Sequence, residues 1–391
     1  MSWLFRGAEV RRCGRAEVLT QCSPMPPQYF RTSAPPHGLV FRIGVLLLIL
    51  LPGCDQLMDR EAERALRARA DRSILQSPDL HVILCGTGSP LPDKDRAGAC
   101  TAVVAGGEFV LVDVGPGAWE TVDLAGLPIG DLSAVLLTHF HSDHIGDLGE
   151  ATTQSWIAGR TRPLDVYGPE GTAQVVAGFD QAYAADERYR TVHHGADYLP
   201  PSAAPAVGHD IALADAPDAD AVVFDRNGLR VTMFRVHHDP VVPAVGYRFD
   251  FGGRSVVVSG DTAKTASVVE HAKGADLLIH EALQREMMGR VAAAAERIGN
   301  ARLAKMARDT LGYHTSPVEA AEVARDAGVS TLVLSHLVPG PRNFLMRRMF
   351  LAGVRDVFAG EVVLGEDGMR FDLAPRPVEH GMRRSASTGG G

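Results

Sequence analysis

Four residues that could bind metal follow one apolar run of the chain. The run is 134–138, and directly after it come His139, His141, Asp143 and His144. His139 and His141 are two residues apart, so an extended backbone points both imidazoles the same way. Asp143 and His144 would lie on the turn that opens a helix, where they can face a second site. Imidazole and carboxylate groups at this density are typical ligands of zinc or another divalent transition metal.

Four more apolar segments each end on a residue that could bind a metal ion. These residues are His238, Asp261, His280 and His336. In stacked α/β sheets, strand ends on one side form a shared crevice. A single buried histidine is more often structural than functional. Imidazoles and carboxylates that converge from distant positions are hard to explain by core packing, so the set predicts a metal site.

The elements that must position these residues follow an α/β pattern from residue 80 onward, with sheets covered by helices. Strands are predicted at 81–85, 101–105, 109–114, 134–138, 164–167, 229–236, 245–249, 255–259, 277–279 and 331–334. Helices are predicted at 171–185, 262–272, 317–327 and within 283–311. Residues 200–222 are low in apolar bulk and are predicted to form a surface excursion.

The motifs resemble those of the metallo-β-lactamase superfamily, in its ribonuclease Z and arylsulfatase-like branch. The superfamily motifs are His-x-His-x-Asp-His at 139–144, Ser-Gly-Asp-Thr at 259–262 and Leu-Ser-His at 334–336. The motifs that resemble the branch are at 85–90, 236–248, 280–282 and 313–316. The resemblance covers about residues 80–375. It implies an α/β fold, the αβ/βα four-layer sandwich, with the metals at the sheet edge.

The resemblance also implies the roles of the site residues. Two Zn²⁺ ions are expected, with Mn²⁺ or Fe²⁺ as alternatives, and a hydroxide between them would attack the substrate. The first ion would be held by His139, His141 and His238, the second by Asp143, His144 and His336, and Asp261 would bridge them. Asp143 and His314 are expected to act in catalysis, His314 as general acid or as a donor to the anionic oxygens of the substrate. Asp113 would either orient a ligand or cap a turn.

Three further histidines leave alternatives open. His237 precedes His238 and could be the ligand instead, although the spacing to Gly246 favours His238. His194 lies where glyoxalase-like members place their third histidine, but their Gly-His-Thr motif is missing, so we interpret it as a pocket or structural residue. The role of His280 stays open.

The substrate is predicted from charge and from one short connection. Bacterial ribonuclease Z inserts an RNA-gripping arm before the Ser-Gly-Asp-Thr motif, where this chain has only residues 248–255. The formal net charge is −8. A chain with this charge lacks the positive surface expected of a protein that binds nucleic acid phosphates. We therefore expect a small phosphodiester, sulfate ester or related ester as substrate, and no nucleic acid partner. The alternatives are a tRNA 3′-processing endoribonuclease and a non-catalytic metal-binding lipoprotein, and a homodimer is among the expected assemblies.

The N-terminus predicts export. Arg42 precedes an apolar run at 43–51, too short to span a bilayer but typical of a signal peptide. The following Pro52-Gly53-Cys54 resembles a lipobox, so Cys54 is predicted to be lipidated, with an uncleaved anchor as the alternative. We expect an exported, membrane-anchored enzyme. Its parts would be an extension at 1–54, a spacer at 55–79, the hydrolase domain at 80–375 and a disordered tail at 376–391.

The chain has five cysteines and no Cys-x-x-Cys motif. Cys85 and Cys100 lie in apolar runs near the start of the predicted domain. Buried free cysteines behave as small hydrophobic residues. We therefore expect two free thiols here rather than a disulfide.

Overall fold

The computed structural model describes residues 55–64, 66–67 and 71–377. The predicted leader and the predicted lipidation site at Cys54 lie outside the described residues. Within the described ranges, no helix combines the length and the apolar character needed to cross a membrane. Residues 55–64 are helical, and all the elements below follow them in the chain.

In the described part of the chain, fourteen strands form two seven-stranded sheets. The strands of the first sheet, in spatial order, are β14 (Arg370–Leu373), β1 (Leu80–Gly86), β2 (Cys100–Ala105), β3 (Glu108–Val112), β4 (Leu132–Leu136), β5 (Leu164–Gly168) and β6 (Ala206–Asp210). Those of the second are β13 (Glu361–Leu364), β12 (Thr331–Val338), β11 (Leu277–Leu283), β10 (Arg254–Val258), β9 (Val245–Phe251), β8 (Leu229–Arg235) and β7 (Asp220–Arg226).

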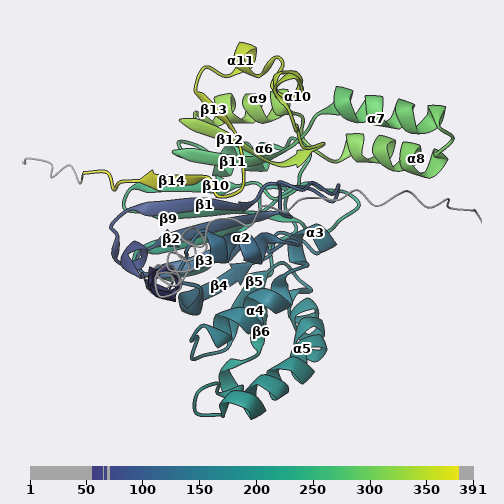
Figure 1. Ribbon diagram of the computed structural model, residues 1–391. Helices are drawn as coiled ribbons and strands as arrows, with labels where there is room; N and C mark the ends of the chain where they lie inside the picture. The colour runs from purple at the N-terminus through teal and green to yellow at the C-terminus, as the bar shows by residue number, and fades with distance from the viewer. Residues whose placement is uncertain (1–54, 65, 68–70, 378–391) are drawn as a thin grey trace, which may run out of the picture. The chain divides into compact units, whose positions relative to one another are not determined.

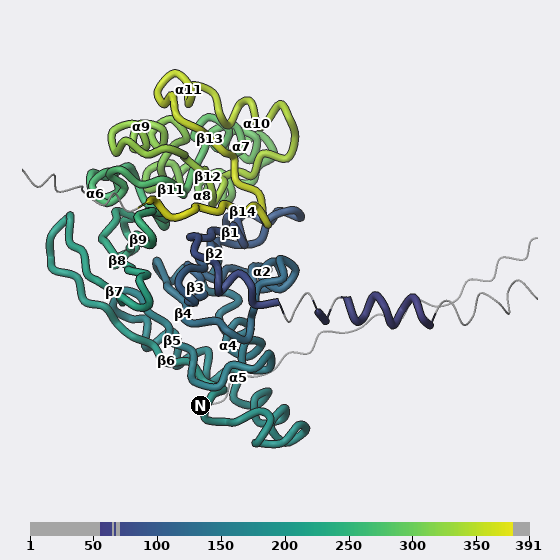
Figure 2. Tube along the Cα trace, turned by 90° about the vertical axis from the view of Figure 1, so that its left-hand side faces the viewer, coloured from purple at the N-terminus to yellow at the C-terminus, as the bar shows by residue number. Residues whose placement is uncertain are grey.

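Helices cover the outer face of each sheet (Figures 1 and 2). Beside the first sheet lie α2 (Ala118–Leu124), α3 (Ser142–Ile145), α4 (Leu148–Ile157) and α5 (Thr172–His194). With the second sheet belong α6 (Ala266–His271), α7 (Arg285–Arg297), α8 (Ala301–Asp309), α9 (Pro317–Ala327), α10 (Phe344–Phe350) and α11 (Val354–Val357). Short 3₁₀ turns are η1 (Ser73–Gln76), η2 (Ile129–Asp131), η3 (Pro201–Ala203) and η4 (Thr310–Gly312). The predicted four-layer αβ/βα sandwich is therefore confirmed.

The main core lies between the two sheets, and the strand period of two builds it. Along β4, Ala134 and Leu136 face the other sheet, whereas Val135 and Leu137 pack under the helices. Along β11, Ile279 faces the first sheet and Leu278 faces the helices of its own half. Both faces of each of these strands are buried, which explains why their sequences are continuous apolar runs.

The ends of the central strands lie on one edge of the sandwich. Strands β3, β4 and β5 run parallel in the first sheet, as do β10, β11 and β12 in the second. The carboxyl ends of parallel strands meet at one edge of a sheet, so the polar residues that follow them are brought together. The predicted surface excursion at 200–222 instead contains β6 and the start of β7. Both are edge strands with exposed positions, and their low apolar content hid them.

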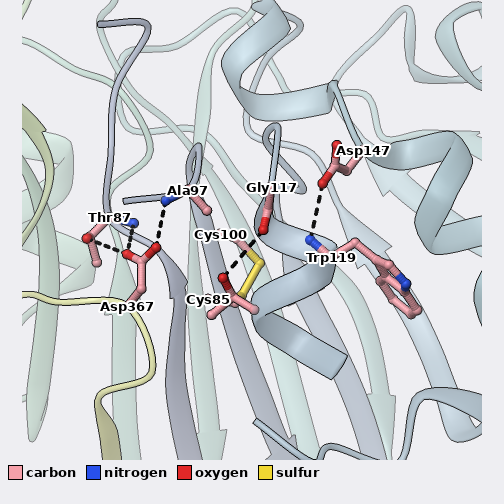
Figure 3. Close-up of a disulfide and its surroundings, with 9 residues drawn as sticks. Cys85, Thr87, Ala97, Cys100, Gly117, Trp119, Asp147 and Asp367 are labelled. Atoms are coloured by element: carbon pink, nitrogen blue, oxygen red, sulfur yellow. Dashed lines mark hydrogen bonds between the residues drawn. A yellow bond between two sulfur atoms is a disulfide. The ribbon is translucent and has the colours of Figure 1, made fainter. Parts of the chain in front are cut away.

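Cys85 and Cys100 form a disulfide, so the prediction of two free thiols is wrong (Figure 3). The antiparallel pairing of β1 with β2 sets Gly86 opposite Cys100. An irregularity between Leu84 and Gly86 then leaves Cys85 within bonding reach. The pairing of β1 with β2 brings the two cysteines together, and their spacing in the sequence does not reveal this pairing.

Candidate metal centre

The first group of predicted ligands meets where β4 and β8 end. His139 Nε2 lies 2.9 Å from His141 Nδ1. Two nitrogens bound to one tetrahedral zinc ion lie about 3.3 Å apart, so this separation suits a shared ion. His238 joins them from the other sheet, and its Nδ1 lies 3.1 Å from the backbone oxygen of Tyr313. That contact fixes the ring and leaves Nε2 facing the group.

The second group lies beside the first. His336 lies within β12, and its Nε2 atom is 3.1 Å from Asp143 Oδ2. The Nε2 atom of His144 is 3.7 Å from the same carboxylate oxygen. All three side chains are buried. They therefore form a compact set with one carboxylate and two imidazoles.

Asp261, which follows β10, lies between the two groups. Its Oδ2 atom is 4.0 Å from His139 Nε2 and 3.8 Å from His238 Nε2. The same atom is 3.4 Å from His144 Nε2 and 3.5 Å from His336 Nε2. A single carboxylate oxygen is thus within reach of imidazoles from both groups, which is the place of a bridging ligand.

Several polar atoms of the predicted ligands are buried and have no hydrogen-bond partner among the described residues. They are His144 Nε2, His238 Nε2, His336 Nδ1 and Asp261 Oδ1. Leaving such groups unpaired in a protein interior is costly. A bound cation would satisfy those that point at it, so the residues present fit a metal.

The protonation of the site also fits metal binding. Burial lowers the pKa of His139 well below its usual range and lowers the pKa of His238 as well. Burial alone would raise the pKa of Asp261, but His336 and His144 hold it well below the usual range. Metal ligands must be neutral imidazoles and ionised carboxylates. His139, His238 and Asp261 are held in that form.

Asp113 orients one of these imidazoles. Its Oδ2 atom lies 2.7 Å from His144 Nδ1 and accepts the hydroxyl of Thr138 at 2.7 Å, and its Oδ1 atom accepts the backbone N–H of Thr138 at 2.8 Å. This leaves His144 Nε2 to face Asp261. Asp113 and His336 also have left-handed backbones, with φ of 58° and 45°. Non-glycine residues are strained there, and such strain clusters at functional sites.

His314 adjoins the centre and is held by a carboxylate that the sequence analysis did not assign. Its Nδ1 atom lies 3.1 Å from Glu281 Oε1, which also accepts the backbone N–H of Thr315 at 2.9 Å. Burial lowers the pKa of His314, but the Glu281 carboxylate outweighs it and raises that pKa to about 9. An ionisable residue inside the fully buried strand β11 was the available signal, since a buried carboxylate needs partners.

The structure separates the remaining histidines from the centre. His237 is exposed and lies 3.3 Å from Asp239, so His238 is the inward-facing member of the pair. His194 is exposed at the end of α5. His280 is fully buried in β11, where its Nδ1 atom contacts the backbone oxygen of Glu281 at 2.8 Å.

Cavities of different size lie beside the predicted ligands. A wide trough of about 700 Å³ is lined by Asp143 on one side and by Lys94, Arg96 and Arg342. A smaller pocket of about 190 Å³ reaches His141, Asp261 and His314 and is otherwise mostly apolar. Pro90 and Leu91 line both cavities. The site therefore has one wide approach with charged residues on its wall and one small approach that is mostly apolar.

Comparison with known proteins places this fold and site in a family. The model of the β-lactamase superfamily domain matches residues 109–337. A ribonuclease Z of Mycobacterium bovis (strain BCG / Pasteur 1173P2) is 37% identical over 76% of this chain and 99% of its own length. A ribonuclease Z of Mycolicibacterium paratuberculosis is 39% identical over 75% of this chain and 98% of its own length. The structure of the human short-form tRNase Z matches with a TM-score of 0.54 and 22% identity, over 75% of this chain and 99% of that chain.

The chain belongs to the β-lactamase superfamily. It is a metal-dependent hydrolase, so the non-catalytic alternative is set aside. Three expectations are wrong in the light of the relatives named ribonuclease Z: a small ester as the main substrate, the absence of a nucleic acid partner, and an exported, membrane-anchored state. The first two relied on a missing arm and an acidic average charge, and neither shows where an RNA binds. The third relied on residues 42–54, which lie outside the described residues.

Proposed function

We propose that this protein is a binuclear zinc-dependent endoribonuclease of the ribonuclease Z type, which cleaves a tRNA precursor at its 3′ end. The observation that carries the proposal is similarity over whole proteins. The two mycobacterial ribonucleases Z are 37% and 39% identical over 99% and 98% of their lengths. The match to the superfamily domain at residues 109–337 includes all the proposed metal ligands.

The proposed metal ligands fall into the two groups described for the metal centre. His139, His141 and His238 would hold one ion, Asp143, His144 and His336 the other, and Asp261 would contact both. Divalent ions bound there would polarise the phosphoryl oxygens and activate water for attack at phosphorus. Burial favours the neutral form of His139 and His238, and Asp113 orients His144.

His314 has the geometry of a proton donor. With Nδ1 directed at Glu281, its other ring nitrogen is free to face the substrate. Water would add to phosphorus, the bond to the 3′ oxygen would break, and a proton from His314 would go to that oxygen. The products are a 3′ hydroxyl on the tRNA and a 5′ phosphate on the trailer. A pKa of about 9 keeps His314 protonated at neutral pH.

The wide trough offers a place for the RNA backbone. Lys94 and Arg342 are exposed side chains on its wall, where they pair with Asp95 and Asp93. Phosphate contacts from such side chains position an RNA without reading its sequence. The connection between β9 and β10 is only Gly252-Gly253, so the RNA must be held by surfaces around the site rather than by an arm there.

The test is cleavage of a transcribed tRNA precursor with a 3′ trailer by the zinc-loaded full chain. One cut at the end of the acceptor stem is expected, and none by the His139→Ala/His141→Ala variant. An aryl phosphodiester, an aryl sulfate and a lactone are assayed in parallel. Turnover of one of these without any cut in the precursor would reject the proposal.

A further inference from the structure

The apolar pocket beside the centre is built by a helical hairpin, α7 and α8, which projects from the second sheet (Figure 1). Met288 and Val291 of α7 and Leu303 and Met306 of α8 form its wall. The same pocket is also lined by His141, Asp261 and His314. A group that enters the pocket therefore lies beside proposed metal ligands and His314.

The size and chemistry of the pocket restrict what it can hold. At about 190 Å³ it is smaller than the cavities of 300–1,000 Å³ that enclose drug-sized ligands. It has room for one small ring system. Methionine side chains make favourable contacts with aromatic rings, and Tyr313 adds an aromatic side chain to the lining. A flat, aromatic group is the best match to this lining.

The hairpin is basic, unlike the chain as a whole. Residues 285–309 contain six Arg or Lys and three Asp or Glu, whereas the whole chain has a net charge of −8. All three acidic residues form ion pairs within the hairpin. Arg297 and Arg302 are exposed, and neither has an acidic partner on the hairpin. Free cations on the hairpin that forms the wall of the apolar pocket suit a ligand that combines an aromatic ring with phosphates.

We propose that this pocket binds the unpaired base of the nucleotide on the 5′ side of the scissile phosphate. The inference deepens the proposed function and rests on it. The side is chosen because the pocket adjoins His314, which is proposed to protonate the 3′ oxygen of that nucleotide. RNA is read mostly at unpaired bases stacked on aromatic and apolar side chains. The hairpin would thus select RNAs that end their duplex just before the cut.

The experiment combines an abasic substrate with a pocket variant. Wild-type enzyme is assayed on the precursor with and without the base on the 5′ side of the cut. Removing the base should lower kcat/KM about 5- to 150-fold, the range of one stacked base. Leu303→Ala/Met306→Ala, which keeps good helix formers in α8, should cause a similar loss on the intact precursor and little further loss on the abasic one. This loss of additivity identifies a contact.

Two controls separate the pocket from the hairpin. Ile298→Ala changes an exposed apolar residue, 78% accessible, at the end of α7 and outside the pocket, and should cleave both substrates as the wild type does. An abasic site at the first trailer nucleotide should leave kcat/KM unchanged. In addition, 2-aminopurine on the 5′ side should lose fluorescence on binding wild-type protein, and lose less on binding Leu303→Ala/Met306→Ala.

The outcomes distinguish this inference from the proposed function. If the precursor is cut equally well with and without the base, or if only the trailer base matters, the pocket assignment is wrong and the endoribonuclease proposal stands. If the double variant lowers kcat/KM equally for the intact and the abasic precursor, the wall residues do not contact that base and the assignment is again wrong. If no RNA is cut while an aryl phosphodiester is hydrolysed, both proposals fail together.

Discussion

The carboxylate of Glu281 lies 3.1 Å from Nδ1 of His314, and the two residues are 33 positions apart in the chain. The same oxygen accepts the backbone N–H of Thr315, so the carboxylate fixes both the ring and the segment that carries it. Glu281 is a positioning residue, because it acts through His314 rather than on the substrate. This pair gives the first prediction.

Replacing Glu281 with Gln should shift the pH dependence of cleavage. Glu281 raises the pKa of His314 to about 9, so removing its charge lowers that pKa. A general acid must be protonated, so the rate falls as pH rises through its pKa. In Glu281→Gln this fall should begin at lower pH than in the wild type, with metal content unchanged. The pH profile of kcat from pH 6 to 10 measures it, and identical alkaline limbs would contradict the assigned role.

His314→Ala should keep both metals and lose turnover. General acid catalysis contributes about 10²- to 10⁴-fold, and a loss in that range is expected. The loss should shrink for aryl phosphodiesters with acidic leaving groups, because these depart without a proton. Metal content, melting temperature and kcat are measured on one preparation. Loss of metal together with activity would instead make His314 a ligand, as its place near Asp261 and His336 permits.

Asp261→Ala and His336→Ala should differ in how many ions they remove. Asp261 approaches imidazoles of both groups, at 3.4 to 4.0 Å, whereas His336 belongs to the second group. We expect Asp261→Ala to lower occupancy of both sites and His336→Ala to empty chiefly one. Elemental analysis after zinc reconstitution and gel filtration gives the number of ions per chain. Equal losses in the two variants would exclude the bridging role.

Asp113→Ala should weaken binding at the second site. Its carboxylate holds Nδ1 of His144 at 2.7 Å. Removing a partner that orients a metal-binding histidine typically costs 10- to 100-fold in affinity. Competition with a zinc chelator measures that affinity. Asp113→Asn serves as a second variant, since it retains the shape and an acceptor oxygen, and it should lose less.

The bond between Cys85 and Cys100 should stabilise the fold under oxidising conditions. Closing a loop of this length, with a sequence separation of 15, stabilises a protein by about 3 kcal/mol. Cys85→Ala/Cys100→Ala should lower the free energy of unfolding by about that amount in denaturant titrations without reductant. With reductant, the wild type should approach the variant. Thiol counting on the denatured, unreduced wild type checks the bond directly.

Sequence patterns predicted the parts of the site that each lie on one strand end. One such group lies within six residues of the chain, so its residue types and spacing were sufficient to predict it: His139, His141, Asp143 and His144. Distant residues such as His336 needed the rule that parallel strands share an edge. The pairing of Glu281 with His314 was not predicted, because it depends on how β11 and the loop before α9 pack. The disulfide was missed for a similar reason, since strand register brings Cys85 to Cys100.

The fold was predicted where strands are buried on both faces and was missed at the edges. β4 and β11 are wholly buried, and their apolar runs are plain in the sequence. β6, β7, β13 and β14 have exposed or half-exposed residues at most positions. Their order comes from hydrogen bonds to a neighbour rather than from apolar pattern. The substrate was mispredicted because charge was averaged over the chain, while the hairpin α7–α8 differs from that average.

The proposed ligands are distributed over almost 200 residues, from His139 to His336, and they come from both sheets. During synthesis, the first half of the chain carries His139, His141, Asp143 and His144 but lacks the carboxylate that joins the ions. The set is complete only after residue 336 has left the ribosome and the second sheet has packed on the first. A nascent chain that stops before residue 336 would therefore lack the complete ligand set and, under the proposed function, could not cleave RNA.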